Sequence, residues 1–234
     1  MALPKIDLPI FELILPSTQE KIKYRPFTVK EEKILLVAQE SKEPEQEVLA
    51  AKQVVNNCLI DMDVDDLAMF DLEYVLLMLR SKSVDNNIAF TIKDPDTEEE
   101  VTLSIDVESD PVLTYDDEHT NEIQVNEDFV LYLKYPTINE FFALLSNKDD
   151  DALTNYNVMI NCLDKIASAD EVHYFKDHSA EDIDGFMDNL DGNVIKSIQK
   201  FFETMPKLRH EMKYTNSNGD EKTFVVEGMR TFFI

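Results

Sequence analysis

The sequence predicts an α+β fold made of two similar halves, each running from a strand through capped helices to a β-hairpin. Three observations support this prediction: a strand, proline and helix-capping motif that occurs twice, helical apolar spacing after each copy, and an alternating hairpin pattern near the end of each half. We expect an N-terminal half over residues 1–108, an acidic linker over 109–120 and a C-terminal half over 121–234.

A capping box predicts the first helix of each half. Thr28 with Glu31 forms the box in the first half, and Thr137 with Glu140 forms it in the second. In such a box the threonine side chain accepts a hydrogen bond from the glutamate amide, and the glutamate side chain accepts one from the threonine amide. A proline lies just before each box and ends the preceding strand, because proline donates no hydrogen bond to a sheet.

Apolar residues recur at helical spacing after each box. They predict helices over 44–59 and about 65–82 in the first half. In the second half they predict a helix around 153–163 and another over 194–205, which Pro206 stops.

Alternating polar and apolar residues predict a hairpin at the end of each half. The first lies within residues 88–105 around a Pro-Asp turn, and the second lies within 209–228 around Asn218-Gly219.

Composition excludes several classes of function. The chain has 48 acidic and 22 basic residues, a formal charge of −26 and a pI near 4.3, so most of its surface would repel nucleic acid. Its longest uncharged apolar runs are too short to cross a bilayer, and its first residues lack the pattern of a signal peptide. We therefore expect a folded cytosolic protein with no nucleic-acid or membrane partner.

The search for a catalytic or cofactor site finds no convincing motif. Only four glycines occur, none in a phosphate-binding pattern, and Cys58 and Cys162 lie in helical apolar patterns typical of core thiols. His173 and His178 are five residues apart, which is not a ligand spacing on a helix, and residues 179–182 fit a helix cap better than a calcium loop. We expect no enzyme activity, no cofactor, no metal and no small-molecule substrate.

Three blocks at the start, middle and end of the chain have distinctive amino-acid sequences. They read IKYRPFTVKEEKILLVAQES, then FDLEYVLLMLRSKSV at residues 70–84, and finally FFETMPKLRHEMKY followed by EGMRTFF. These blocks resemble the baseplate hub protein family of T-even-type contractile-tailed phages, which includes the baseplate central-spike subunit and a related hub assembly catalyst. Some relatives carry paired cysteines in the hairpins, like small zinc ribbons, whereas the turns here read KDPDTEEE and TNSNGDEK and contain no thiol. The resemblance therefore implies hairpins that hold together without zinc.

The resemblance implies a function in the central hub of a contractile tail. We expect a non-enzymatic late protein, structural or assisting assembly, whose partners are other baseplate hub or spike proteins. It would lie in the host cytoplasm during assembly, and in the virion tail baseplate if it is a structural subunit. Two alternatives stay open: a hub assembly chaperone or catalyst absent from the mature virion, and an acidic DNA-mimic inhibitor, which the capped helices and basic islands disfavour.

Two basic islands and the apolar chain end are the candidate contact sites. Residues 21–33 and 196–213 each carry five basic residues within a strongly acidic protein, and complementary charge sets docking orientation and encounter rate. The alternative is that these cations pair with the chain's own carboxylates. The last residues either fold back onto their own hairpin or insert into a neighbouring protein. The candidate residues are Lys21, Lys23, Arg25, Lys30, Lys33, Lys207, Arg209, Phe232 and Phe233.

Overall fold

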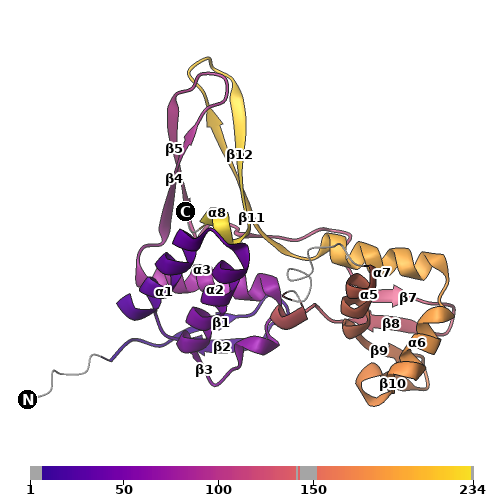
Figure 1. The fold of residues 1–234 in the computed structure, drawn as a ribbon. Coiled ribbons are helices and arrows are strands. Elements are labelled where there is room, and N and C mark those ends of the chain that lie inside the picture. The colour runs from indigo at the N-terminus through magenta and orange to yellow at the C-terminus, as the bar shows by residue number, and fades with distance from the viewer. Residues whose placement is uncertain (1–6, 141, 143–151, 233–234) are drawn as a thin grey trace, which may run out of the picture. The chain divides into compact units, whose positions relative to one another are not determined.

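The computed structural model describes residues 7–140, 142 and 152–232, and it confirms the α+β fold (Figure 1). Contacts divide the chain into two compact units. The first unit joins the residues up to Thr114 with those from Lys207 onward, and the second runs from Tyr115 to Pro206. These boundaries differ from the halves predicted at 1–108 and 121–234, because the C-terminal hairpin pairs with Leu113 and Thr114, inside the predicted linker.

The first unit begins with a three-stranded antiparallel sheet and three helices. The sheet has the order β1-β2-β3, with β1 (Phe11–Ile14), β2 (Lys21–Tyr24) and β3 (Leu59–Ile60), and the helices are α1 (Val29–Ser41), α2 (Pro44–Cys58) and α3 (Met69–Ser83). The predicted helix over 65–82 is divided, because Leu67 and Ala68 are extended between the 3-10 turn η1 (Val64–Asp66) and α3. The fully buried core includes Val54, Val55, Leu72, Leu76 and Leu79.

Two hairpins complete the first unit and lie side by side in Figure 1. They are β4 (Asn87–Lys93) with β5 (Glu100–Asp106), and β11 (Lys207–Thr215) with β12 (Glu221–Glu227); β6 (Leu113–Thr114) adds to the edge of β11, and α8 (Gly228–Phe232) follows β12. Both predicted hairpins are confirmed. The rings of Phe90 and Phe224 join them, with centroids 6.1 Å apart.

The second unit contains a four-stranded antiparallel sheet and its own core. The strands are β7 (Glu122–Gln124), β8 (Val130–Leu133), β9 (Leu163–Ala167) and β10 (Val172–Tyr174), in the order β10-β9-β8-β7, with α5 (Ala152–Asn161), η2 (Phe175–Asp177), α6 (Ala180–Asp188) and α7 (Gly192–Thr204). Leu131, Ile198 and Phe201 pack in its core. The helix expected around 153–163 is shorter than predicted, because Leu163 pairs with β8 as the start of β9.

The two units repeat one local arrangement. Each central strand, β2 or β8, leads through a proline to a capping box, and both predicted boxes form. The chain then returns antiparallel to the central strand after a buried cysteine. The Arg25 amide donates to the Cys58 carbonyl at 3.0 Å, and the Lys134 amide donates to the Cys162 carbonyl at 2.8 Å. Both cysteines are core thiols, as their apolar spacing predicts.

Candidate partner-binding surfaces

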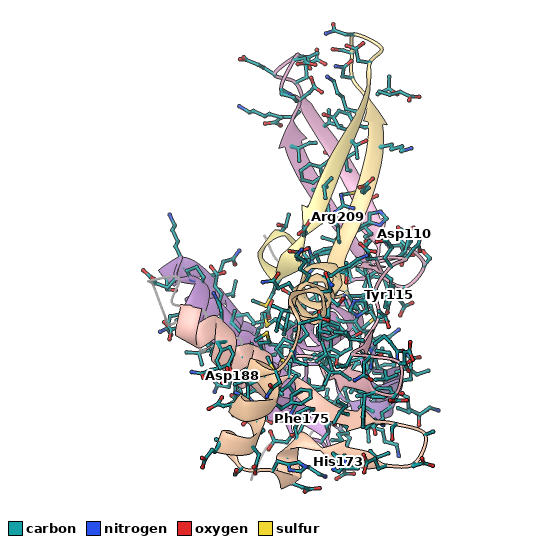
Figure 2. All side chains as sticks on the ribbon, turned by 90° about the vertical axis from the view of Figure 1, so that its right-hand side faces the viewer. Asp110, Tyr115, His173, Phe175, Asp188 and Arg209 are labelled. Atoms are coloured by element: carbon teal, nitrogen blue, oxygen red, sulfur yellow. The ribbon has the colours of Figure 1, made fainter. Side chains whose placement is uncertain are left out.

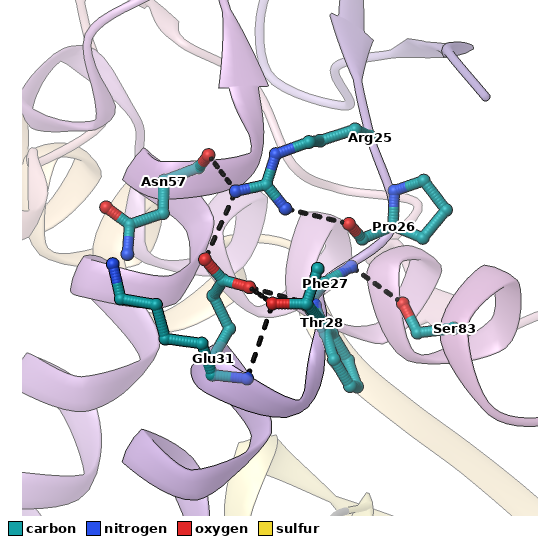
Figure 3. A network of polar contacts seen from close by, with 8 residues as sticks. Arg25, Pro26, Phe27, Thr28, Glu31, Asn57 and Ser83 are labelled. Carbon is teal, nitrogen blue, oxygen red and sulfur yellow. Dashed lines mark hydrogen bonds and ion pairs between the residues drawn. The ribbon is translucent and has the colours of Figure 1, made fainter. Parts of the chain in front are cut away.

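Arg25 is held by its own neighbours at the start of α1 (Figure 3). Its Nη2 donates to Glu31 Oε1 at 3.1 Å and to the Asn57 carbonyl at 2.8 Å, and its Nη1 donates to the Pro26 carbonyl at 2.9 Å. An arginine used in this way joins the capping box to the end of α2. This part of the first basic island therefore matches the alternative of internal pairing.

Glu31 is the centre of this network and is only 3% exposed. Its Oε2 accepts hydrogen bonds from the Thr28 amide at 2.9 Å and from the Thr28 hydroxyl at 2.5 Å. Burial alone would raise the pKa of Glu31, but the hydrogen bonds from Thr28 and Arg25, with the arginine charge, lower it to about 2. Glu31 is therefore ionised throughout the physiological range.

The lysines of the first island differ in their surroundings. Lys21 pairs with Glu12 at 3.0 Å across β1 and β2, where both side chains are exposed. Lys23, Lys30 and Lys33 are also exposed, and the part of the chain that the structure describes contains no ion pair to any of them. These three cations remain available to a partner.

The second island is divided between the two units. Lys196 and Lys200 lie on α7, where Lys200 pairs with Glu118. The other members, Lys207, Arg209 and Lys213, lie on β11, and Figure 2 labels Arg209 at the base of the hairpins.

Arg209 is also paired within its own unit. Its guanidinium contacts Glu211 at 2.6 Å and Glu227 at 3.3 Å, whereas Lys207 is exposed. The structure thus does not bring residues 196–213 together as one free basic patch within either unit.

Phe232 is fully buried inside the first unit. Its ring meets Phe90 edge-to-face with centroids 6.4 Å apart, and α8 packs against α3, β11 and β12. Of the two placements expected for the chain end, this residue adopts the intramolecular one, so it is not available as an exposed anchor. Phe233 lies outside the described residues.

The outer side of α1 carries an exposed apolar surface that the sequence analysis did not identify. Val29 is 65% exposed, Leu36 53% and Val37 68%. At 3.6 residues per turn these side chains lie on one side of the helix together with Lys30 and Lys33. We call these five residues the α1 face.

A groove lies beside this face, between α1 and α3, and has a volume of about 580 Å³. We call it the α1–α3 groove. Leu35 and Leu36 of α1, Leu76 and Arg80 of α3, and Met229 of α8 contribute to its lining. Because Leu36 belongs to both features, the apolar α1 face continues into the groove.

Polar contacts hold the hairpin tips together where the resemblance suggested that relatives carry zinc ligands. Tyr214 donates its hydroxyl hydrogen to Asp94 at 2.8 Å, and Lys222 forms an ion pair with Asp96. Burial would raise the pKa of Asp94, but hydrogen bonds from Tyr214, Thr97 and the Asp96 amide lower it to about 2. Across the described residues, no three side chains of the types His, Cys, Asp and Glu gather in a geometry that could hold a metal.

The two cysteines and His119 are packed against neighbouring side chains. Burial raises the pKa of Cys58 to about 11 and that of Cys162 to about 12, so both thiols stay protonated at neutral pH. His119 stacks on Phe201, with ring centroids 5.3 Å apart, and its Nε2 lies 2.9 Å from the Tyr135 hydroxyl.

His173 and His178 lie closer together than their sequence spacing suggested. Their ring centroids are 5.9 Å apart. His173 lies in β10 and His178 directly follows the 3-10 turn η2, so the two are not on a continuous helix. Sequence reasoning missed this proximity because it considered only helical spacing.

In the described ranges, no helix is both long and apolar enough to cross a membrane. No significant match was found among curated proteins or among solved structures. The family model described as T4 bacteriophage base plate protein matches residues 8–234, which is nearly the whole chain. The chain therefore belongs to the T4-type phage baseplate protein family.

Proposed function

We propose that this chain is a non-enzymatic component of the central hub of the baseplate, held in place by contacts with neighbouring hub or spike proteins. Membership of the baseplate family supports a role in the tail baseplate, and the three blocks that resemble hub proteins favour the hub. Its proposed location is the host cytoplasm during assembly and the virion baseplate afterwards.

The exposed apolar α1 face is the main structural support for a docking function. Fully burying a valine or leucine side chain gains about 1.5 to 3 kcal/mol, so three mostly exposed side chains on one helix leave considerable free energy for association. An amphipathic surface helix normally turns its polar side to water, whereas α1 turns Val29, Leu36 and Val37 outward. Lys30 and Lys33, which lie on the same side, would orient an acidic partner surface.

The absence of enzyme activity is part of the proposal and rests on how the reactive side chains are used. Burial keeps the two thiols protonated, and His119 is half-buried and hydrogen-bonded to Tyr135 and Thr204. A contact function requires none of these groups to be free.

Quantitative mass spectrometry of purified virions tests the structural role. We expect a fixed copy number of this chain per virion. Its absence from virions, together with its presence on assembly intermediates in infected cells, would instead favour the hub assembly chaperone. Binding to DNA-recognising proteins rather than to baseplate proteins would favour the DNA-mimic alternative.

A pair of variants tests the docking face. The double variant Val29→Glu, Val37→Glu should reduce incorporation into baseplates, because two carboxylates would replace exposed apolar side chains without changing the core. Leu49→Glu is the matched control, since Leu49 is an exposed apolar residue on α2 at 43% exposure. Equal incorporation of both variants would contradict the role of the α1 face.

A further inference from the structure

The α1–α3 groove contains a cation whose bonding is incomplete. Arg80 Nη1 is buried and has no hydrogen-bond partner within the described residues. Nearly all buried polar groups in proteins are hydrogen-bonded, and a guanidinium remains charged in folded proteins. Such a group therefore indicates an acceptor that the described residues do not supply.

The charged residues around Arg80 do not supply that acceptor. Asp85 is close enough to act on the pKa of Arg80, opposing the lowering caused by burial, but no ion pair joins the two in the described part of the chain. Glu32 and Lys42 line the groove where they are exposed to water, and Glu47 has other interactions. The half-buried guanidinium of Arg80, with its unpaired Nη1, is thus the charge in this groove with the most to gain from a carboxylate.

The rest of the lining favours large apolar side chains. Leu35, Leu76 and Met229 contribute apolar surface, and two further lining residues, Leu36 and Val84, are 53% and 61% exposed. The groove volume of about 580 Å³ lies within the range of about 300 to 1,000 Å³ that is typical of ligand-binding clefts. Because the apolar surface extends through Leu36 onto the α1 face, an extended protein segment fits it better than an isolated small molecule.

We propose that the α1–α3 groove binds a segment of a partner protein that carries one carboxylate among large apolar side chains. The carboxylate accepts hydrogen bonds from Arg80, and the apolar side chains pack against the leucines of α1 and α3. This inference rests on the proposed function only in taking the partner to be a protein. It adds a second contact site and the chemistry that this site selects.

A random 12-residue peptide library, selected on the immobilised full-length chain, tests this specificity. Selected peptides should contain an Asp or Glu beside at least two large apolar residues. Replacing that acid by its amide should weaken binding about tenfold, which corresponds to about 1.4 kcal/mol. Peptides without a preferred acid, or with a preference for Lys and Arg, would overturn the proposal.

Arg80→Gln is the decisive variant. It should bind the acidic peptide and its amide equally, whereas Arg80→Lys should keep a weaker preference for the acid. A full preference for the acid in Arg80→Gln would overturn the proposal. If Arg80→Gln does not fold, Val84→Glu serves instead, because a glutamate at this exposed position places a repelling charge beside the groove. It should weaken binding of the acidic peptide more than binding of the amide. Equal effects on the two peptides would overturn the proposal.

The Val29→Glu, Val37→Glu variant separates this inference from the proposed function. Neither residue lines the groove, so the variant should keep the wild-type preference for the acidic peptide over its amide, even if both bind more weakly. Loss of baseplate incorporation with this preference retained would support both sites. Normal incorporation with retained peptide discrimination would reject the α1 face and keep the groove.

Discussion

Glu31→Gln removes one charge from the network at the start of α1 and should destabilise the first unit. The carboxylate accepts from Thr28 through Oε2 and from Arg25 through Oε1. A glutamine offers only one oxygen, so its amide group would face one of these donors. Arg25 would also lose the ion pair that neutralises it.

The size of the effect follows from the pKa of Glu31. Its pKa falls from an ordinary 4.5 to about 2, which corresponds to at most about 3 kcal/mol of folding free energy. We expect a loss of about 2 kcal/mol, because Arg25 is partly exposed and water screens the pair. Since the folded pKa is depressed, this contribution is complete above pH 4.5 and is lost as the pH falls towards 2.

Urea unfolding followed by circular dichroism at pH 7 and at pH 3 measures this difference. Glu31→Gln should lower the unfolding free energy at pH 7, and the gap to the wild type should narrow at pH 3. Glu32→Gln is the control, because Glu32 is its exposed neighbour in the first turn and its loss should cost about 0.5 kcal/mol or less. A gap of that small size for Glu31→Gln, or one that stays constant with pH, would refute the role of the network.

Three further predictions concern other parts of the fold. Burial, with a smaller effect of the Glu227 charge, raises the pKa of Glu73 to about 7 despite the hydrogen bond from the Met229 amide, so ionisation of Glu73 lowers stability increasingly from pH 4.5 to above 7. Glu73→Gln should therefore have a higher melting temperature than the wild type at pH 8 and the same melting temperature near pH 4. Equal melting temperatures at both pH values would contradict this. Phe232→Ala should cost about 3 to 5 kcal/mol in urea unfolding because it empties a fully buried site, and a loss below about 1 kcal/mol would mean that α8 is not docked in solution. A strong chelator should leave the melting temperature of the purified chain unchanged, since Tyr214–Asp94 and Lys222–Asp96 contacts join the hairpin tips; released zinc with a lower melting temperature would contradict this.

Local structure was predictable where interactions between residues close in the sequence determine it. The capping boxes at Thr28 and Thr137, and the apolar spacing of α7, involve residues within a few turns of each other. Long-range pairing was not predictable in this way. The pairing of β11 with Leu113 and Thr114 joins residues almost a hundred positions apart, and no local pattern records it.

The candidate site was predictable only in part for the same reason. Lys30 and Lys33 are as exposed as the basic island suggested, but the pairing of Arg25 with Glu31 depends on how the strand enters α1. The α1 face was missed because apolar residues occur on both sides of that helix, and sequence alone does not say which side is covered. The burial of Arg80 Nη1 was not predictable either, because it depends on packing between segments that are distant in the sequence.

Thiol labelling of a Val37→Cys variant tests the central claim, the docking of a partner on the α1 face. Cys58 and Cys162 are buried and protonated, so the introduced cysteine should be the one that reacts readily with a maleimide. The rate of labelling is measured by mass spectrometry in the isolated protein and in purified baseplates that contain it. We predict rapid labelling of the isolated protein and strong protection in the baseplate, whereas equal rates in the two states would contradict the claim.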